Sequence, residues 1–87
     1  MKLQPALIFG EHMVLQRSVP VPVWGRSVRN DTVTVCLGGF SASSGTENGR
    51  WKVVLPPMEA CRQTEMTITS EKTGERIEFR NVAVGEV

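Results

Sequence analysis

The sequence of 87 residues has little net charge and no long apolar run. Ten lysines and arginines against nine aspartates and glutamates give a formal net charge of +1, and the two signs are interleaved along the chain. This balance provides no electrostatic field that would attract nucleic acid or anionic lipid, so neither is expected as a partner. A run of about 20 apolar residues, which a helix needs to cross a bilayer, is also absent, so no membrane association is expected.

The chain is poor in the side chains that usually carry catalysis or bind metals. It has one histidine, His12, and two cysteines, Cys36 and Cys61, which are far apart in the sequence. These three residues lack the ligand spacing of a zinc site, and we expect both cysteines to be free thiols. Ser18, His12 and Glu11 supply the residue types of a Ser-His-acid set, but no Gly-x-Ser-x-Gly motif frames a serine. We therefore expect no metal, no cofactor and no catalytic residue.

Targeting signals are weak. Residues 1–11 contain one lysine and a short apolar run that Gln4 and Pro5 interrupt. The run is too short for the apolar region of a signal peptide and lacks a small-residue cleavage site, which slightly favours a cytoplasmic protein over a secreted one. The sequon Asn30-Asp31-Thr32 is interpreted as a chance match.

The apolar residues follow the period of β-strands. Helical spacing is absent, and short runs that alternate between apolar and polar residues recur roughly every ten residues, with turn residues between them. Residues 1–87 are expected to form a single domain, which buries only about 60% of its unfolded surface. The pattern predicts an all-β fold, an antiparallel β-sandwich of seven or eight short strands. Strands are expected within residues 5–9, 13–16, 19–24, 32–37, 50–55, 65–69, 77–79 and 81–87, and residues 40–44 can continue the strand at 32–37 beyond Gly38-Gly39.

Residues 19–24, Val-Pro-Val-Pro-Val-Trp, are the most constrained of these runs. Proline cannot donate a hydrogen bond to a sheet, so this run fits an edge or bulged strand and not the centre of a sheet. Alternation separates the valines, taken as the core face, from the prolines and the tryptophan, which we expect to be half-buried. The two faces are Val19, Val21 and Val23 against Pro20, Pro22 and Trp24.

Turn residues set the connections. Asn48-Gly49 supplies the positive φ angles of a two-residue hairpin turn, and Gly74 suits the left-handed position of a tight turn at residues 71–74. Gly38-Gly39 is expected to break or bulge the ladder. Trp51 has the alternating spacing of a core residue, and Met58 is expected to plug the end of the core. Cys36 falls on the wetter face of its strand.

Several stretches together resemble the N-terminal β domain of the sialate O-acetylesterase family, a branch of the SGNH-type carbohydrate esterases. The resemblance extends over nearly the whole chain. Its residues are Leu7-Ile8-Phe9, His-Met-Val-Leu-Gln-Arg at 12–17, Pro-Val-Pro-Val-Trp-Gly at 20–25, Val-Thr-Val at 33–35, Gly-Arg-Trp at 49–51, Leu-Pro-Pro at 55–57 and Asn-Val-Ala-Val-Gly-Glu-Val at 81–87.

This resemblance implies an immunoglobulin-like sandwich within a larger esterase. In the family, the last run leads directly into Trp-x-Cys-Ser-Gly-Gln-Ser, whose first serine is the nucleophile, so the hydrolase domain would start after Val87. The parent enzyme would remove acetyl esters from sugars such as sialic acid, with acetylated glycan as its partner. The chain itself would be an inactive accessory domain that supports the hydrolase domain. We expect that domain to contact Met13, Trp24, Val84 and Val87.

Two other functions compete with this interpretation. An independent module that binds carbohydrate or protein would need exposed aromatic side chains in a groove, where Trp24 is a better candidate for stacking on a sugar than Trp51. A stand-alone esterase would need a nucleophile motif that these residues do not contain. The apolar run at 81–87, which stops without a polar tail, favours the accessory domain.

Overall fold

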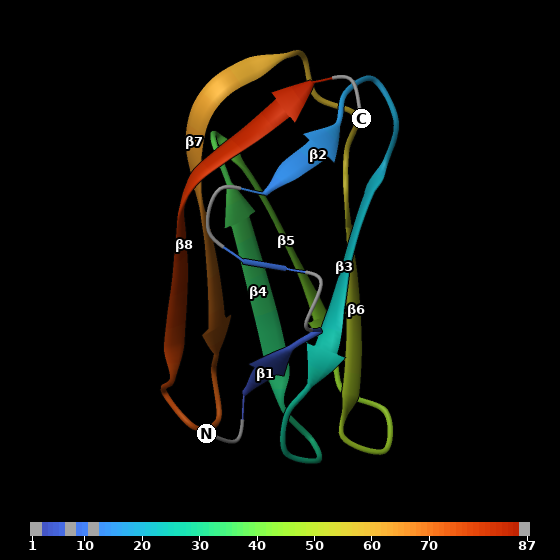
Figure 1. Ribbon diagram of the computed structural model, residues 1–87. Coiled ribbons are helices and arrows are strands. Elements are labelled where there is room, and N and C mark those ends of the chain that lie inside the picture. The colour runs from blue at the N-terminus through green and yellow to red at the C-terminus, as the bar shows by residue number, and fades with distance from the viewer. Residues whose placement is uncertain (1–2, 7–8, 11–12, 86–87) are drawn as a thin grey trace.

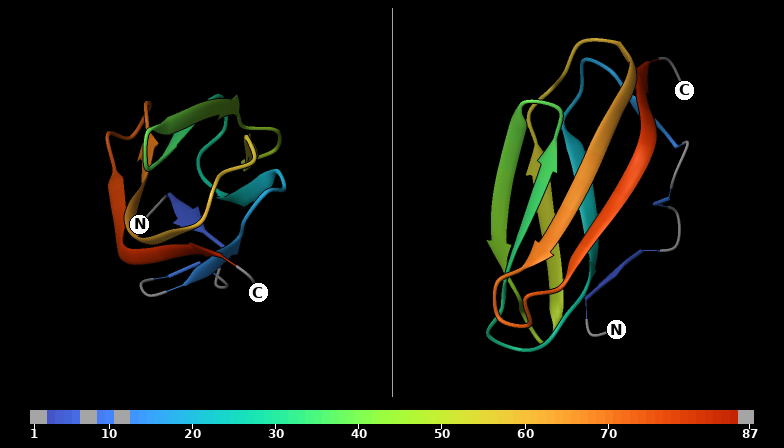
Figure 2. Two further views of the ribbon diagram at one scale, coloured as in Figure 1. Left: turned by 90° about the horizontal axis from the view of Figure 1, so that it is seen from above. Right: turned by 90° about the vertical axis from the view of Figure 1, so that its left-hand side faces the viewer.

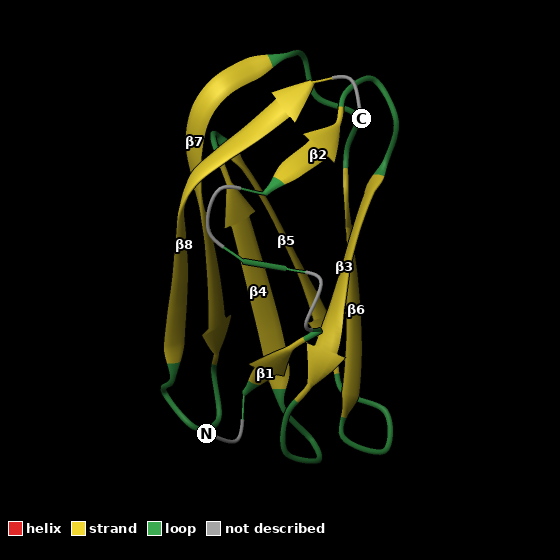
Figure 3. Cartoon of the chain, viewed as in Figure 1, coloured by secondary structure: helices red, strands yellow, loops and turns green. Residues whose placement is uncertain are grey.

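The computed structural model describes residues 3–6, 9–10 and 13–85, apart from the side chain of Arg62. This part of the chain is all β (Figure 3). It forms a three-stranded sheet, ordered β1-β3-β6, and a five-stranded sheet, ordered β2-β8-β7-β4-β5, which pack as the two layers of a sandwich (Figures 1 and 2). The predicted all-β sandwich is confirmed. The strands are β1 (Gln4–Pro5), β2 (Val14–Gln16), β3 (Val21–Arg26), β4 (Thr32–Leu37), β5 (Phe40–Gly45), β6 (Arg50–Leu55), β7 (Cys61–Ser70) and β8 (Arg76–Gly85).

The core lies between the two sheets, where the apolar faces of the alternating strands meet. Trp51 and Met58 belong to it, as predicted, with 3% and 7% of their surface exposed. Val19 does not, because β3 begins at Val21 and leaves Val19 43% exposed in the preceding connection. The buried apolar residues are Leu3, Phe9, Val21, Val23, Val33, Val35, Leu37, Trp51, Val53, Leu55, Met58, Met66, Ile68, Val82 and Val84.

The predicted edge position of the proline-containing strand is wrong, since β3 lies between β1 and β6. The prolines are nevertheless compatible with this place. The backbone of Trp24 faces β1, because its carbonyl accepts a hydrogen bond from the N–H of Ala6. Pro22 lies two residues earlier, so its backbone faces the same side, away from β6. The N–H that proline lacks is therefore not needed for the pairing with β6. Because β1 pairs only with Gly25 and Arg26, that side of Pro22 is beyond the β1 ladder.

The Asn48-Gly49 turn has the predicted backbone but a different role. Asn48 and Gly49 have φ angles of 52° and 77°, and Glu47 and Arg50 exchange two backbone hydrogen bonds across them. The strands on either side, however, belong to different sheets, β5 to the five-stranded one and β6 to the three-stranded one. The turn therefore joins the two layers of the sandwich.

The five-stranded sheet departs from the prediction at one edge. Its β2 strand runs parallel to β8, with Val14 opposite Ala83, so the sheet is not wholly antiparallel. Strands so far apart in sequence are not joined by a hairpin, and either direction is then open to them. The two strands expected at 77–79 and 81–87 form one strand, β8, up to Gly85. Its pairing with β7 shifts register twice between Cys61 and Met66.

Asp31 is a buried charged residue at one end of the sandwich, where it links two turns. Only 3% of its surface is exposed. Its Oδ2 atom accepts hydrogen bonds from the hydroxyls of Ser27, at 2.6 Å, and Ser70, at 2.5 Å. Its Oδ1 atom accepts from the N–H groups of Thr32, at 2.8 Å, and Lys72, at 2.9 Å. The carboxylate thus connects the turn before β4 to the turn between β7 and β8.

The hydrogen bonds around Asp31 set its protonation. Burial alone would raise the pKa of this carboxyl, but the bonds from the Ser27 and Ser70 hydroxyls and from the N–H groups of Lys72 and Thr32 hold it below its ordinary value. A pKa that is lower in the folded than in the unfolded chain means that the carboxylate stabilises the fold above the unfolded pKa. That contribution is lost as the pH falls toward the folded pKa.

Asp31→Asn is expected to lower the free energy of unfolding at pH 7 by about 1–3 kcal/mol, because all four donors lose a charged acceptor and two of them face an NH2 group in place of an oxygen. The difference from the unmodified chain should stay constant down to about pH 4 and shrink below it, as the carboxyl of Asp31 itself becomes protonated. Urea unfolding between pH 7 and pH 2.5 measures this difference. Glu71→Gln, at an exposed neighbour, is the control, and a difference that grows on acidification would contradict the prediction.

Candidate functional site

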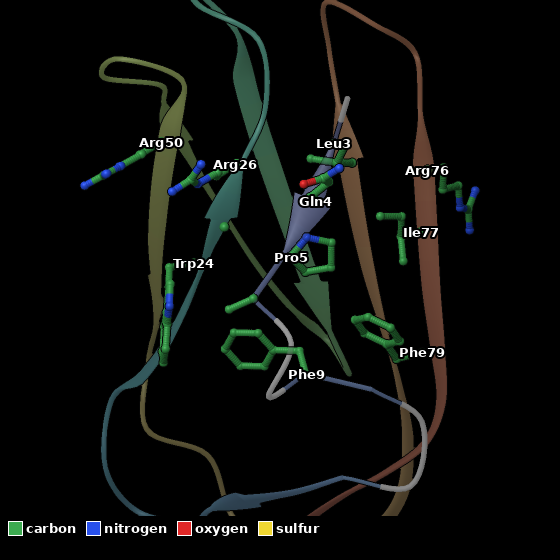
Figure 4. A pocket seen from close by; sticks show the side chains of 12 residues that line it. Leu3, Gln4, Pro5, Phe9, Trp24, Arg26, Arg50, Arg76, Ile77 and Phe79 are labelled. Carbon is green, nitrogen blue, oxygen red and sulfur yellow. The ribbon is translucent and has the colours of Figure 1, made fainter. Parts of the chain in front are cut away.

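A groove of about 1250 Å³ opens where the N-terminal segment passes from the three-stranded to the five-stranded sheet. β1 belongs to the first sheet and β2 to the second, so the chain changes sheets between Pro5 and Val14 (Figure 1). Figure 4 shows the side chains that line the groove, with an apolar floor and arginines at its rim. The apolar side chains are Leu3, Pro5, Ala6, Phe9, Trp24, Ile77 and Phe79.

Trp24 and Phe9 form the aromatic part of this groove. Their ring centroids are 5.0 Å apart and their planes meet at 78°, an edge-to-face arrangement. Phe9 is 8% exposed, whereas Trp24 is 39% exposed, which agrees with the expectation that Trp24 is half-buried. Trp24 lies on the outward face of β3 because Val21 and Val23 occupy the inward face. Its indole ring is therefore supported on one side and open on the other.

Gly25 permits the close approach of β1 that forms the groove. A Cβ atom at this position would lie 2.2 Å from the Gln4 carbonyl oxygen, 2.7 Å from the Cα of Pro5 and 2.8 Å from the Trp51 ring. Beneath it, the Nε1 of Trp51 donates a hydrogen bond of 3.1 Å to the carbonyl of Arg26. Trp51 thus supports the floor from inside the core, and a buried ring in this position has no face free to stack on a sugar.

Two arginines stand side by side at the rim of the groove. Arg26 on β3 and Arg50 on β6 are direct partners across the ladder, and both side chains point outward from the sheet. Like charges in this arrangement repel each other. Neither forms an ion pair within the part of the chain that the structure describes, whereas Arg76, on the far rim, pairs with Glu78 at 3.0 Å. The rim near Trp24 therefore carries two adjacent arginines.

Three of the four residues expected at a domain interface, Met13, Trp24 and Val84, lie within the described residues, at different places. Trp24 lines the groove, and Met13 packs partly buried against the core, with its carbonyl bonded to the N–H of Ala83. Val84 is 4% exposed and lines a separate depression at one end of the sandwich. Val87 lies outside the described residues. Contact of these residues with a second domain stays a prediction.

The described residues bring together no set of groups for nucleophilic catalysis or metal binding. Ser27 and Ser70 bond to Asp31. His12 and Glu11, the other members of the Ser-His-acid set considered from the sequence, lie outside the described residues. No cluster of three or more potential metal ligands occurs in residues 3–6, 9–10 and 13–85. Cys36 and Cys61 are both free, as predicted, and both are exposed. Within the same residues, no helix has the length and apolarity that crossing a membrane requires.

Sequence reasoning missed two features of this region. The Asp31 cluster draws its donors from residues 27 to 72, and no local pattern marks Asp31 as buried. The groove depends on Gly25, which the sequence pattern indicated only as the end of the proline-containing run. A glycine that follows an outward tryptophan in an alternating strand was the one available signal, because glycine inside a strand often marks a close backbone approach.

Comparison with solved structures shows a carbohydrate esterase among the proteins that this chain resembles. The structure is similar to a carbohydrate acetylesterase from Xanthomonas citri, with a TM-score of 0.86 and 33% sequence identity over 94% of this chain. The chain spans only 19% of the length of that protein, the size of one domain within it. No family model matches the sequence, and no curated protein matches it.

Gly25→Ala is expected to destabilise the fold by roughly 1–3 kcal/mol, because β1 and the Trp51 ring must both move to admit the methyl group. Gly39→Ala is the matched control, since a Cβ atom there meets nothing within 4 Å. Thermal unfolding of both variants, followed by circular dichroism, compares them. Equal loss of stability in the two would contradict the close approach at Gly25.

The two tryptophans should differ in their contribution to stability. Trp51→Ala is expected to cost about 3–5 kcal/mol because it empties a core position. Trp24→Ala should cost only about 1 kcal/mol, the value of its edge-to-face contact with Phe9 and of its partial burial. Urea denaturation of each variant measures the difference. A larger loss for Trp24→Ala than for Trp51→Ala would mean that the exposed ring, and not the buried one, holds the sheets together.

Proposed function

We propose that this chain is an accessory domain of a larger carbohydrate esterase and that its role is structural. The observation that carries the proposal is the similarity to the Xanthomonas citri acetylesterase, which extends over nearly the whole of this chain but only a domain-sized part of that protein. The described residues fit such a role, because they form a complete core without a nucleophile, base and oxyanion site in one place.

The finer assignment is to the sialate O-acetylesterase type of SGNH esterase. The motifs at residues 12–17, 20–25 and 81–87 support it, and the resemblance implies that an immunoglobulin-like domain precedes a hydrolase domain starting after Val87. The parent protein would then hydrolyse O-acetyl esters on sugars such as sialic acid or the sugars of xylan. Acetylated glycan would bind to the parent and not to this domain.

An independent binding module is the second candidate. The half-exposed Trp24, supported by Phe9 and flanked by Arg26 and Arg50, has the composition of a site for a sugar or a protein segment that carries an acidic group. The accessory domain remains the stronger proposal. The similarity to the acetylesterase extends over 94% of this chain, whereas the groove occupies only one side of the sandwich.

Esterase activity tests the proposal directly. Residues 1–87, once shown to be folded by circular dichroism, are expected not to hydrolyse p-nitrophenyl acetate above the buffer rate. The longer protein that continues the reading frame beyond Val87 should release acetate from an O-acetylated sugar. A longer protein without this activity would overturn the proposal. Binding of O-acetylated sialic acid to residues 1–87, lost in Trp24→Ala but not in Val54→Ala, would support the binding module instead.

A further inference from the structure

The two ends of the sandwich differ in the chemistry of their connections (Figure 1). At the end where Asp31 lies, residues 27–31, 46–49 and 71–75 form polar turns. The opposite end is built from residues 17–20, 38–39 and 56–60, whose charged residues are Arg17 and Glu59. The charged residues of the polar end are Arg29, Asp31, Glu47, Glu71, Lys72 and Glu75.

The opposite end, referred to below as the apolar end, exposes apolar side chains around a depression of about 460 Å³. Phe40, the first residue of β5, lines the depression and is 45% exposed. Pro57 and Met58 line it from the connection between β6 and β7, and Cys61 lines it from the start of β7. Phe40, Pro57 and Met58 thus line one apolar depression together.

The apolar end is also where the last described strand finishes. Val84 of β8 lines the depression, and the carbonyl of Gly85 accepts a hydrogen bond of 2.9 Å from the N–H of Arg17. Ser18 in turn donates to the carbonyl of Met58. These bonds hold the end of β8 against the connections of the apolar end. Residues 86 and 87 separate Gly85 from the continuation proposed above, and two extended residues span about 7 Å.

We infer that the part of the parent protein that follows Val87 docks on the apolar end and covers Phe40, Pro57 and Cys61. This inference rests on the proposed function, since it assigns the surface through which the accessory domain contacts the hydrolase domain. With the hydrolase domain starting directly after Val87, as proposed above, its first residues lie close to Gly85 and so beside this surface. The groove at Trp24 is the less suitable place, because it lies with β1 and the end of β3 toward the polar turns (Figure 1).

The two native thiols report on this contact. Cys61 lines the depression, whereas Cys36 lies on the outward face of β4, where it alternates with the inward Val35 and Leu37. Both are exposed in the domain itself. In the longer protein under native conditions, N-ethylmaleimide should therefore modify Cys61 at least tenfold more slowly than Cys36. Peptide-resolved mass spectrometry measures the two rates, and the protein in urea, where both thiols should react alike, provides the reference.

Two variants of the longer protein test the same contact. Phe40→Asp places a charge in the covered surface and should raise the rate of Cys61 modification at least fivefold. Val54→Asp is the matched control, because Val54 is 51% exposed on the outward face of β6 and should leave the rate unchanged. A longer protein that hydrolyses acetyl esters while Cys61 reacts as fast as Cys36 would overturn the docking surface and leave the proposed function standing. Loss of the proposed function would appear separately, as absence of esterase activity in the unmodified protein.

Discussion

The packing of the Trp51 ring beneath Gly25 is the contact on which the groove at Trp24 depends. The ring is fixed from one side by its hydrogen bond to the carbonyl of Arg26, and glycine leaves the space above it that β1 needs. Once β1 lies against β3, the following residues must cross to the five-stranded sheet, and this crossing brings Phe9 onto Trp24. A single buried side chain thus determines the geometry of a groove that it does not line.

The predictable part of the fold was local. Alternation placed Val33, Val35 and Leu37 inward and Cys36 outward, and the backbone of Asn48-Gly49 followed from residue type alone. The misplaced features are those that depend on residues far apart in sequence. These are the central position of β3, the parallel pairing of β2 with β8, and the role of the Asn-Gly turn in joining two sheets. The hydrogen bonds of Asp31 to Ser70 and Lys72 could not be predicted for the same reason.

The candidate site could be predicted only in part. Trp24 was identified from the outward parity of its position, and its partial exposure follows from that parity. Val84 was grouped with it because both lie in apolar runs, but β8 turns this side chain into the core near the opposite end of the sandwich. Sequence patterns identify which side chains are apolar, whereas the strand order decides which of them share a surface. The groove and the apolar end are therefore separate surfaces, with separate chemistry.

The edge strands of this sandwich bear on how the domain behaves beside other chains. Exposed edges of sheets invite pairing with strands of neighbouring molecules, which leads to aggregation. Here β2 gives β8 a partner only three residues long, and β5, at the other edge of that sheet, consists mostly of serine, alanine and glycine. The outward face of β6 carries Arg50 and Lys52. Short and charged edges resist such pairing, so copies of this domain are expected to remain separate when they meet.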